Sequence, residues 1–176
     1  MSELIDDLLD IGRIEAGVGI EMAPCEVGSL VKTVVADSLG RAEAKNLKLQ
    51  LGLPPTLPRI VGDGTLIKRA VANLVDNAIK YTPEGSVTVR VRETDNYLVV
   101  SVSDTGIGIA PADQMRLFEK FYRIKRRDTI RIKGTGLGLA IVKSIAGRHN
   151  GKVWVESKLG EGSIFYLALP IEQPER

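Results

Sequence analysis

The stretch Lys133–Gly147, KGTGLGLAIVKSIAG, combines two conflicting features. From Leu137 on, apolar residues recur with helical spacing, which predicts a helix. Glycines nevertheless occupy positions 134, 136 and 138, where that helix begins, although each glycine in a helical turn costs about 1 kcal/mol relative to alanine. A helix N-terminus gathers free N–H groups and partial positive charge, and glycines let an anion approach them closely. The stretch therefore predicts a phosphate-binding turn, an interpretation that is compatible with a flexible hinge.

Two common phosphate-binding patterns do not fit this stretch. A P-loop requires a lysine and a serine or threonine after its last glycine, whereas Leu139 and Ala140 follow Gly138. The dinucleotide pattern G-x-G-x-x-G requires a strand directly before it, whereas RRDTIRIK precedes Gly134 and the spacing is G-x-G-x-G. A nicotinamide or flavin oxidoreductase is therefore disfavoured.

The segment Leu66–Gly85 carries a second strong pattern. Its apolar residues share one helical stripe and predict a core-facing surface, formed by Ile67, Val71, Leu74 and Ala78. Asn73, Asn77 and Lys80 fall on a different stripe, which is often only a solvated face. The alternative is a row that faces a phosphate and its metal, since an asparagine carbonyl suits Mg²⁺ and a lysine can meet a phosphate.

An aspartate ends the predicted strand within Leu98–Pro111, LVVSVSDTGIGIAP. We expect Asp104 at the edge of a cleft, where its carboxylate can only accept hydrogen bonds and suits the exocyclic amine of adenine. Gly106 and Gly108 let the backbone approach a ligand closely. An ordinary aspartate-glycine turn is the alternative interpretation.

The remaining patterns predict a two-layer α/β (α+β) sandwich, with a mixed, mostly antiparallel sheet covered by helices on one face. Helices are expected over Leu4–Gly17, Glu26–Asn46 (broken or bent at Gly40), Gly64–Tyr81 with Asp63 as cap, and near Pro111–Phe118. Strands are expected over Leu47–Leu53, Ser86–Glu93, Tyr97–Asp104, Lys152–Ser157 and Gly162–Pro170. The proline-rich residues 54–63 are expected to form a connection.

Composition narrows the function classes. The 176 residues suit one globular domain with a short appendage, and the single cysteine, Cys25, forms no internal disulfide. The net charge is only +2, but Lys120–Gly134 holds seven basic residues against Asp128, giving +6 locally. This charge does not indicate nucleic acid binding, because no aromatic residue interrupts Ile124–Lys133 to stack on bases. No apolar run approaches the roughly 20 residues of a membrane span, so direct membrane contact is not expected.

Four motifs together resemble a known family. NLVDNAIKYTPEG, DTGIGI, LFEKFYR and GTGLGLAIVK occur in this order. They resemble the N, G1, F and G2 boxes of the ATP-binding catalytic domain of bacterial sensor histidine kinases. That domain belongs to the GHKL superfamily, which includes type II topoisomerases and large heat-shock chaperone ATPases. Each box is weak alone, but the four in order are specific.

The resemblance implies an Mg²⁺-ATP site with a mobile lid. Asn77 would bind the metal with Asn73 nearby, Lys80 and Arg123 would reach phosphates, and Asp104 would read the adenine amine. The catalytic set would be Asn77, Lys80 and Arg123. The other nucleotide-contacting positions would be Asn73, Tyr81, Asp104, Gly106, Ile107, Gly108, Phe118, Phe121, Lys133, Gly134, Thr135, Gly136, Leu137 and Gly138. Phe118 and Phe121 would anchor the lid, which the basic run Arg123–Lys133 would form.

The resemblance also implies a domain division and partners. Residues 1–17, which include LIDDLLDIGRIEAG, resemble the tail of the second helix of a dimerisation and phosphotransfer hairpin, and residues 18–176 would be the catalytic domain. The expected partners are that hairpin and a response-regulator receiver domain. The complete protein would be a cytoplasmic homodimer, free or anchored in the inner membrane, whereas this chain alone would be monomeric. His149, at a helix end near the C-terminal dipole, is not expected to be the phosphoacceptor.

The implied activity is transfer of the ATP γ-phosphoryl group to a histidine of the hairpin, followed by relay to a regulator aspartate. Two alternatives remain at this point: an ATP-dependent switch without phosphotransfer, and an anti-sigma-type protein serine kinase. A topoisomerase-like ATPase is disfavoured because position 73, the first of the N box, is asparagine rather than a hydrolytic base.

Overall fold

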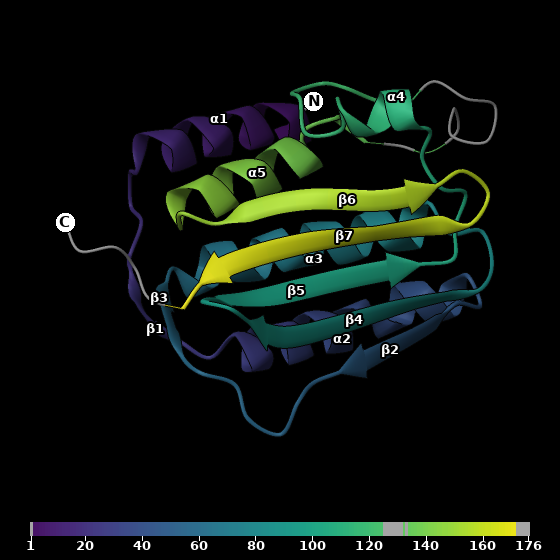
Figure 1. Cartoon of the computed structure of the whole chain (residues 1–176). Coiled ribbons are helices and arrows are strands. Elements are labelled where there is room, and N and C mark those ends of the chain that lie inside the picture. Colours follow the sequence, from purple (N-terminus) through teal and green to yellow (C-terminus); the bar gives the residue numbers. More distant parts are fainter. Residues whose placement is uncertain (1, 125–131, 133, 172–176) are drawn as a thin grey trace.

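A computed structural model describes residues 2–124, 132 and 134–171. The helices are α1 (Ser2–Ala16), α2 (Val27–Ala44), α3 (Gly64–Lys80), α4 (Pro111–Gln114) and α5 (Gly138–Arg148). The strands are β1 (Ala23–Cys25), β2 (Lys48–Gly52), β3 (Ile60–Gly62), β4 (Ser86–Thr94), β5 (Tyr97–Asp104), β6 (Lys152–Lys158) and β7 (Gly162–Pro170). Figure 1 shows a main sheet with helices on one face. The predicted two-layer sandwich is confirmed.

The main sheet has five strands in the order β2-β4-β5-β7-β6. Only the β2–β4 pair is parallel, and the other three neighbours are antiparallel. The tight β4–β5 hairpin turns at Asp95, whose φ of 48° places it in the left-handed region. Asp104 pairs with Ser163 across β5 and β7, so both residues reach the same end of the sheet.

The helix layer owes its position to the predicted apolar stripe of α3. All four stripe residues are fully buried: Ile67, Val71, Leu74 and Ala78. They lie against inward side chains of the sheet, including Val89, Leu98 and Phe165. Burying a side chain of this size stabilises the fold by about 1.5–3 kcal/mol. The stripe of Asn73, Asn77 and Lys80 is thereby turned away from the core.

The structure departs from the sequence prediction in three elements. Residues 23–25, for which no element was predicted, and residues 60–62, predicted to lie in a connection, form a small antiparallel sheet, β1–β3. The helix expected near Pro111–Phe118 ends after four residues, because the chain continues in i+3 turns such as Arg116 N–H to the Asp113 carbonyl (3.0 Å). Helix α2 continues through Gly40 without a break.

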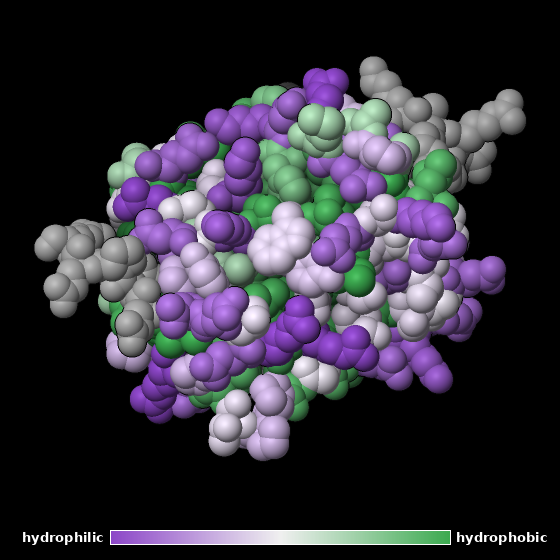
Figure 2. Space-filling view, viewed as in Figure 1, coloured by the Kyte–Doolittle hydropathy of each residue, from purple (hydrophilic) through white to green (hydrophobic). Residues whose placement is uncertain are grey.

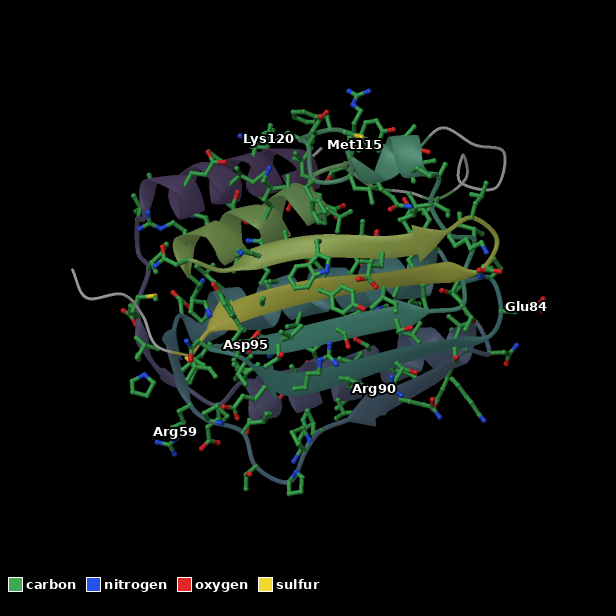
Figure 3. All side chains as sticks on the ribbon, viewed as in Figure 1. Arg59, Glu84, Arg90, Asp95, Met115 and Lys120 are labelled. Carbon is green, nitrogen blue, oxygen red and sulfur yellow. The ribbon has the colours of Figure 1, made fainter. Side chains whose placement is uncertain are left out.

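The uncovered face of the main sheet is largely hydrophilic in Figure 2. A stacked aromatic pair, Trp154 and Tyr166, lies on it with ring centroids 5.0 Å apart. The Tyr166 hydroxyl donates to Glu156 (3.2 Å), and Arg90 lies exposed on β4 (Figure 3). Within the described residues, no helix is long and apolar enough to cross a bilayer.

His149 has a different role from the expected one. It follows α5 as predicted, but its ring is fully buried. Nε2 accepts the Asp63 backbone N–H (2.9 Å), and Nδ1 lies 2.7 Å from the Ile145 carbonyl. This geometry fits a neutral ring that donates from Nδ1, so hydrogen bonding rather than a charge on the helix dipole places it there. The ring ties the end of α5 to the start of α3.

Replacing His149 with leucine is expected to destabilise the fold by about 2 kcal/mol, because the buried Asp63 N–H and the Ile145 carbonyl each lose a partner. Urea unfolding followed by circular dichroism measures this loss. His149→Gln keeps a donor and an acceptor and should lose less. Equal stability of His149→Leu and the parent would contradict the assigned role.

Candidate functional site

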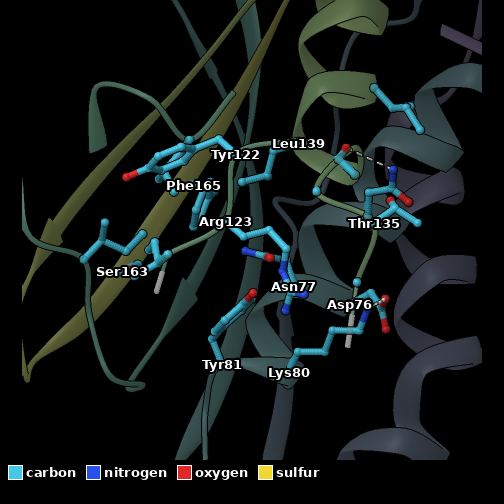
Figure 4. A pocket seen from close by; sticks show the side chains of 18 of the residues that line it. Asp76, Asn77, Lys80, Tyr81, Tyr122, Arg123, Thr135, Leu139, Ser163 and Phe165 are labelled. Carbon is cyan, nitrogen blue, oxygen red and sulfur yellow. Dashed lines mark hydrogen bonds and ion pairs between the residues drawn. The ribbon is translucent and has the colours of Figure 1, made fainter. Parts of the chain in front are cut away.

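A single cleft gathers most of the residues predicted from sequence. It opens between α3, the start of α5 and the ends of β5 and β7. Figure 4 shows Asn77, Lys80 and Tyr81 on the α3 side, with Arg123 extending toward them. The predicted positions that line the cleft are Asn73, Asn77, Lys80, Tyr81, Asp104, Ile107, Gly108, Arg123, Gly134, Thr135, Gly136 and Gly138.

The polar row of α3 is fixed at both helix ends. The Asp63 side chain caps the N-terminus by accepting the Leu66 N–H (3.1 Å), as predicted. At the other end, the Lys45 ammonium donates to the Ile79 carbonyl (2.6 Å), and burial lowers the Lys45 pKa. Lys80 pairs with Asp76 (3.3 Å) one turn away on the exposed side of the row.

Asn73 contacts the glycine-rich segment directly. Its Nδ2 donates to the Gly138 carbonyl (3.2 Å), which joins α3 to the first residue of α5. Asn77, one turn further along α3, lines the cleft. The two asparagines therefore differ in their contacts: Asn73 hydrogen-bonds to the glycine-rich segment, whereas the Asn77 side chain lines the cleft.

Asp104 is the buried acceptor at the inner end of the cleft. The residue is 8% exposed, and Oδ1 accepts the N–H groups of Gly106 (2.9 Å) and Ser163 (3.3 Å). Burial raises the Asp104 pKa to about 6, and these two hydrogen bonds oppose the shift. Because both bonds end on Oδ1, Oδ2 is the oxygen left to accept a hydrogen bond from a ligand.

The turn after Asp104 requires glycine at position 108. Gly108 has φ of +71°, and a Cβ built there would lie 2.1 Å from the Lys158 carbonyl oxygen. The close approach accompanies a hydrogen bond from the Gly160 N–H to the Ile107 carbonyl (2.8 Å). The glycine thus lets the DTGIGI turn lie directly against the β6–β7 connection and form one wall of the cleft.

Position 136, on the opposite wall of the cleft, also requires glycine. Gly136 has φ of +78°, and its added Cβ would lie 2.9 Å from backbone atoms of Phe121. The Phe121 N–H donates to the Gly136 carbonyl (2.9 Å), so the two segments meet backbone to backbone. Leu137 then caps α5, whose first turn points into the cleft.

Several predicted positions lie around the cleft rather than in its lining. Gly106 packs against the Tyr81 carbonyl, and Leu137 is fully buried. Phe118 packs edge-on against Phe165, with centroids 6.3 Å apart, whereas the Phe121 ring is 53% exposed and contributes through its backbone. Lys133, and most of the predicted lid, lie outside the described residues.

The cleft also contains residues that sequence patterns did not indicate. Asp76 could have been found from its i,i+4 spacing to Lys80. No local signal marks the others, since they come from distant segments and their placement depends on the tertiary fold. They include Glu3, Asp7, Arg69, Tyr122, Ser163 and Phe165.

The donor set suits a nucleotide. The buried Asp104 carboxylate and apolar side chains line the inner end of the cleft. Lys80, Arg123 and the glycine-rich start of α5 line the outer end, together with the acidic Glu3, Asp7 and Asp76. Mg²⁺ is usually held by one or two protein oxygens together with substrate phosphates. The described residues contain no cluster of three or more His, Cys, Asp or Glu side chains that could hold a metal unaided. Asn77 fits the first arrangement.

Comparisons with known proteins agree with this geometry. Residues 62–173 match the family described as histidine kinase-, DNA gyrase B-, and HSP90-like ATPase. The chain is 39% identical to the sensor-like histidine kinase SenX3 of Mycobacterium tuberculosis, over 97% of this chain and 42% of that protein. It is also 39% identical to the sensor histidine kinase RppB of Synechocystis, over 97% of this chain and 38% of that protein.

A solved structure shows the same arrangement. Full-length ShkA in complex with AMPPNP superposes with a TM-score of 0.84 and 29% identity, over 99% of this chain and 36% of that chain. The sandwich is that of an ATP-binding catalytic domain. The chain belongs to the histidine kinase-, DNA gyrase B-, and HSP90-like ATPase family, and its named relatives are sensor histidine kinases. It spans less than half the length of those curated relatives.

Proposed function

We propose that this chain binds Mg²⁺-ATP in the cleft and supplies the phosphoryl donor for a histidine kinase reaction. The observation that carries the proposal is the convergence of the α3 polar row, the buried Asp104 carboxylate and the glycine-rich start of α5 on one cleft. These groups come from separate parts of the sequence and match three parts of a Mg²⁺-bound nucleotide: the base, the triphosphate and the metal ion.

The base is placed at the inner end. Asp104 Oδ2 accepts a hydrogen bond from the adenine amine, and Tyr81 and Ile107 line the same region. Guanine presents a carbonyl oxygen where adenine presents an amine, so the carboxylate repels it. Asp104 therefore selects ATP over GTP.

The triphosphate is placed at the outer end. Lys80 and Arg123 supply positive charge, and backbone amides near Gly136 and Gly138 are oriented by the start of α5. The Asn77 carbonyl is the protein ligand for Mg²⁺, which when bound neutralises phosphate charge. Phosphoryl transfer depends mainly on such positioning and charge stabilisation, so this set needs no covalent intermediate on the protein.

The phosphoryl acceptor is a histidine on the dimerisation hairpin, from which the group passes to a response-regulator aspartate. His149, the one histidine of the sequence, is fully buried and uses both ring nitrogens in the fold. It is therefore unsuited to accept a phosphoryl group. Residues 1–17 are the tail of the hairpin and residues 18–176 the catalytic domain.

Within the complete protein we place this domain in the cytoplasm, as part of a homodimer that meets a receiver domain. The relatives named above are sensor histidine kinases, which favours this interpretation over a serine kinase or a switch without transfer.

Titration calorimetry with ATP and GTP, each with and without Mg²⁺, tests the proposal. Binding of ATP that strengthens with Mg²⁺ and exceeds GTP binding is the expected result. Adding a separately prepared histidine hairpin with labelled ATP then tests transfer. Absence of nucleotide binding, or equal binding of ATP and GTP, would contradict the assigned site.

Asn77→Asp is expected to weaken Mg²⁺-ATP binding by about tenfold, because the new charge lies beside Asp76 and faces the triphosphate. The weakening should depend on the Mg²⁺ concentration, since the altered group is the proposed metal ligand. Asp37→Asn, on the exposed surface of α2, is a control that should not alter affinity. Normal Mg²⁺-ATP affinity together with an unchanged dependence on Mg²⁺ concentration in Asn77→Asp would contradict the metal assignment.

A further inference from the structure

Helix α1 brings acidic side chains to the mouth of the cleft. Glu3 and Asp7 line it, and the Asp7 carboxylate is only 18% exposed. Arg69 of α3 pairs with Asp7 (3.4 Å) and with Asp10 (2.7 Å). These pairs hold the N-terminal half of α1 beside the outer end of the cleft, where the proposed function places the triphosphate.

Thr135 links this helix to the glycine-rich segment. Its hydroxyl donates to Asp7 Oδ2 (3.1 Å) and accepts the Leu137 backbone N–H (3.2 Å). Leu137 is the N-cap residue of α5, so its N–H belongs to the group of amides that an anion would meet there. Leu137 is itself fully buried, and the Thr135 hydroxyl, which lines the cleft, lies between this amide and the cleft.

We propose that Asp7 and Thr135 form a latch that competes with the nucleotide triphosphate and couples cleft occupancy to the docking of α1. This inference rests on the proposed ATP site. A phosphate that takes over the Leu137 N–H displaces the Thr135 hydroxyl, which breaks its bond to Asp7. The phosphate also adds negative charge beside the half-buried Asp7 carboxylate, and at short range in a partly desolvated site the two repel each other.

The coupling acts in both directions. A contact that weakens nucleotide binding by a given factor must itself be weakened by the nucleotide by the same factor. The C-terminal half of α1 is held independently, because Ile11 and Ile14 are buried and Glu15 pairs with Lys120 (3.4 Å). Nucleotide should therefore loosen the half of α1 around Asp7, whose large apolar residues are already exposed: Leu4, Ile5, Leu8 and Leu9.

Asp7→Ala tests the latch, with Asp6→Ala as the matched control. Asp6 is exposed on the same helix, so both variants remove one negative charge at nearly the same place. By calorimetry in Mg²⁺, Asp7→Ala should bind ATP about tenfold more tightly than the parent, a factor that corresponds to about 1.4 kcal/mol. Asp6→Ala should bind as the parent does.

Hydrogen exchange supplies the reciprocal measurement. Saturating ATP should speed amide exchange within residues 3–10 of the parent and of Asp6→Ala, and should leave Asp7→Ala unchanged. ATP binding in Asp7→Ala that is equal to or weaker than that of the parent would overturn the latch while leaving the ATP site intact. Absence of ATP binding in all three proteins would instead remove both the site and the latch.

Discussion

Asp104→Asn is expected to weaken ATP binding by about a hundredfold and to abolish the preference for ATP over GTP. The asparagine oxygen can still accept the Gly106 and Ser163 N–H groups, which turns its amide NH₂ toward the ligand. That NH₂ then faces the adenine amine, so two donors meet in a buried place at a cost of up to about 3 kcal/mol. Competitive displacement of a fluorescent ATP analogue by ATP and GTP measures both effects.

The pH dependence of binding supplies the control for this prediction. In the free protein burial raises the Asp104 pKa to about 6, so below that pH the carboxyl is protonated and must lose its proton to accept the amine. ATP affinity should fall as pH decreases through 6. Phosphate titrates near the same pH, and Asp104→Asn shows that contribution alone. Equal pH profiles of parent and variant would contradict the adenine contact.

The raised pKa of Asp104 also affects the stability of the folded protein. A carboxyl whose pKa is raised in the folded state holds a proton that the unfolded chain has already released. The contribution of Asp104 to the stability of the free protein should therefore fall as pH rises from about 4 to about 6, and the difference in unfolding free energy between the parent and Asp104→Asn measures it. Asp104→Asn removes a buried charge and should be at least as stable as the parent at neutral pH. Loss of ATP binding in this variant then cannot be attributed to unfolding.

The features that were predictable from sequence are those encoded by local periodicity. The apolar stripe of α3 repeats every three or four residues, and its burial places Asn73, Asn77 and Lys80 on the opposite side. Asp104 is the last residue of a hydrophobic strand, and such a residue lies at one end of the sheet. Residues of two walls of the cleft were therefore predictable from the sequence.

The remaining features depend on contacts between distant segments. The pairing of β1 with β3 joins residues about 37 positions apart, and three-residue strands carry too short a pattern to be recognised. Asp7 and Thr135 are 128 positions apart, and the residue pattern of neither segment predicts their contact. His149 was placed correctly at the end of α5, but its partner Asp63 was recognised only as a cap.

The contacts of the glycines were only partly predictable from the sequence. The sequence predicted that Gly106, Gly108 and Gly136 let the backbone approach a ligand closely, but it did not predict that other parts of the protein backbone approach these glycines. The structure supplies the partners: the Tyr81 carbonyl for Gly106, the Lys158 carbonyl for Gly108 and the Phe121 backbone for Gly136. These partners lie far away in the sequence, so the spacing of the glycines carries no information about them.

Gly108→Ala is expected to cost at least about 3 kcal/mol of folding free energy. Alanine in the left-handed region costs about 1–2 kcal/mol. The new Cβ would also lie 2.1 Å from the Lys158 carbonyl oxygen and 2.9 Å from the Leu159 Cα, which are backbone atoms that cannot rotate away. The clash can be relieved only if the DTGIGI turn moves away from the β6–β7 connection. This movement also lengthens the hydrogen bond from the Gly160 N–H to the Ile107 carbonyl.

Urea unfolding measures this loss, with Gly40→Ala as the matched control. Gly40 lies inside α2, and a Cβ there would meet nothing within 4 Å, so the same chemical change should stabilise by about 0.5–1 kcal/mol. Opposite signs for the two variants would show that the close approach, rather than the added methyl group, destabilises Gly108→Ala. A Gly108→Ala variant as stable as the parent would mean that this wall of the cleft can shift freely. The rigid base-binding end that positions Asp104 would then lose its structural support.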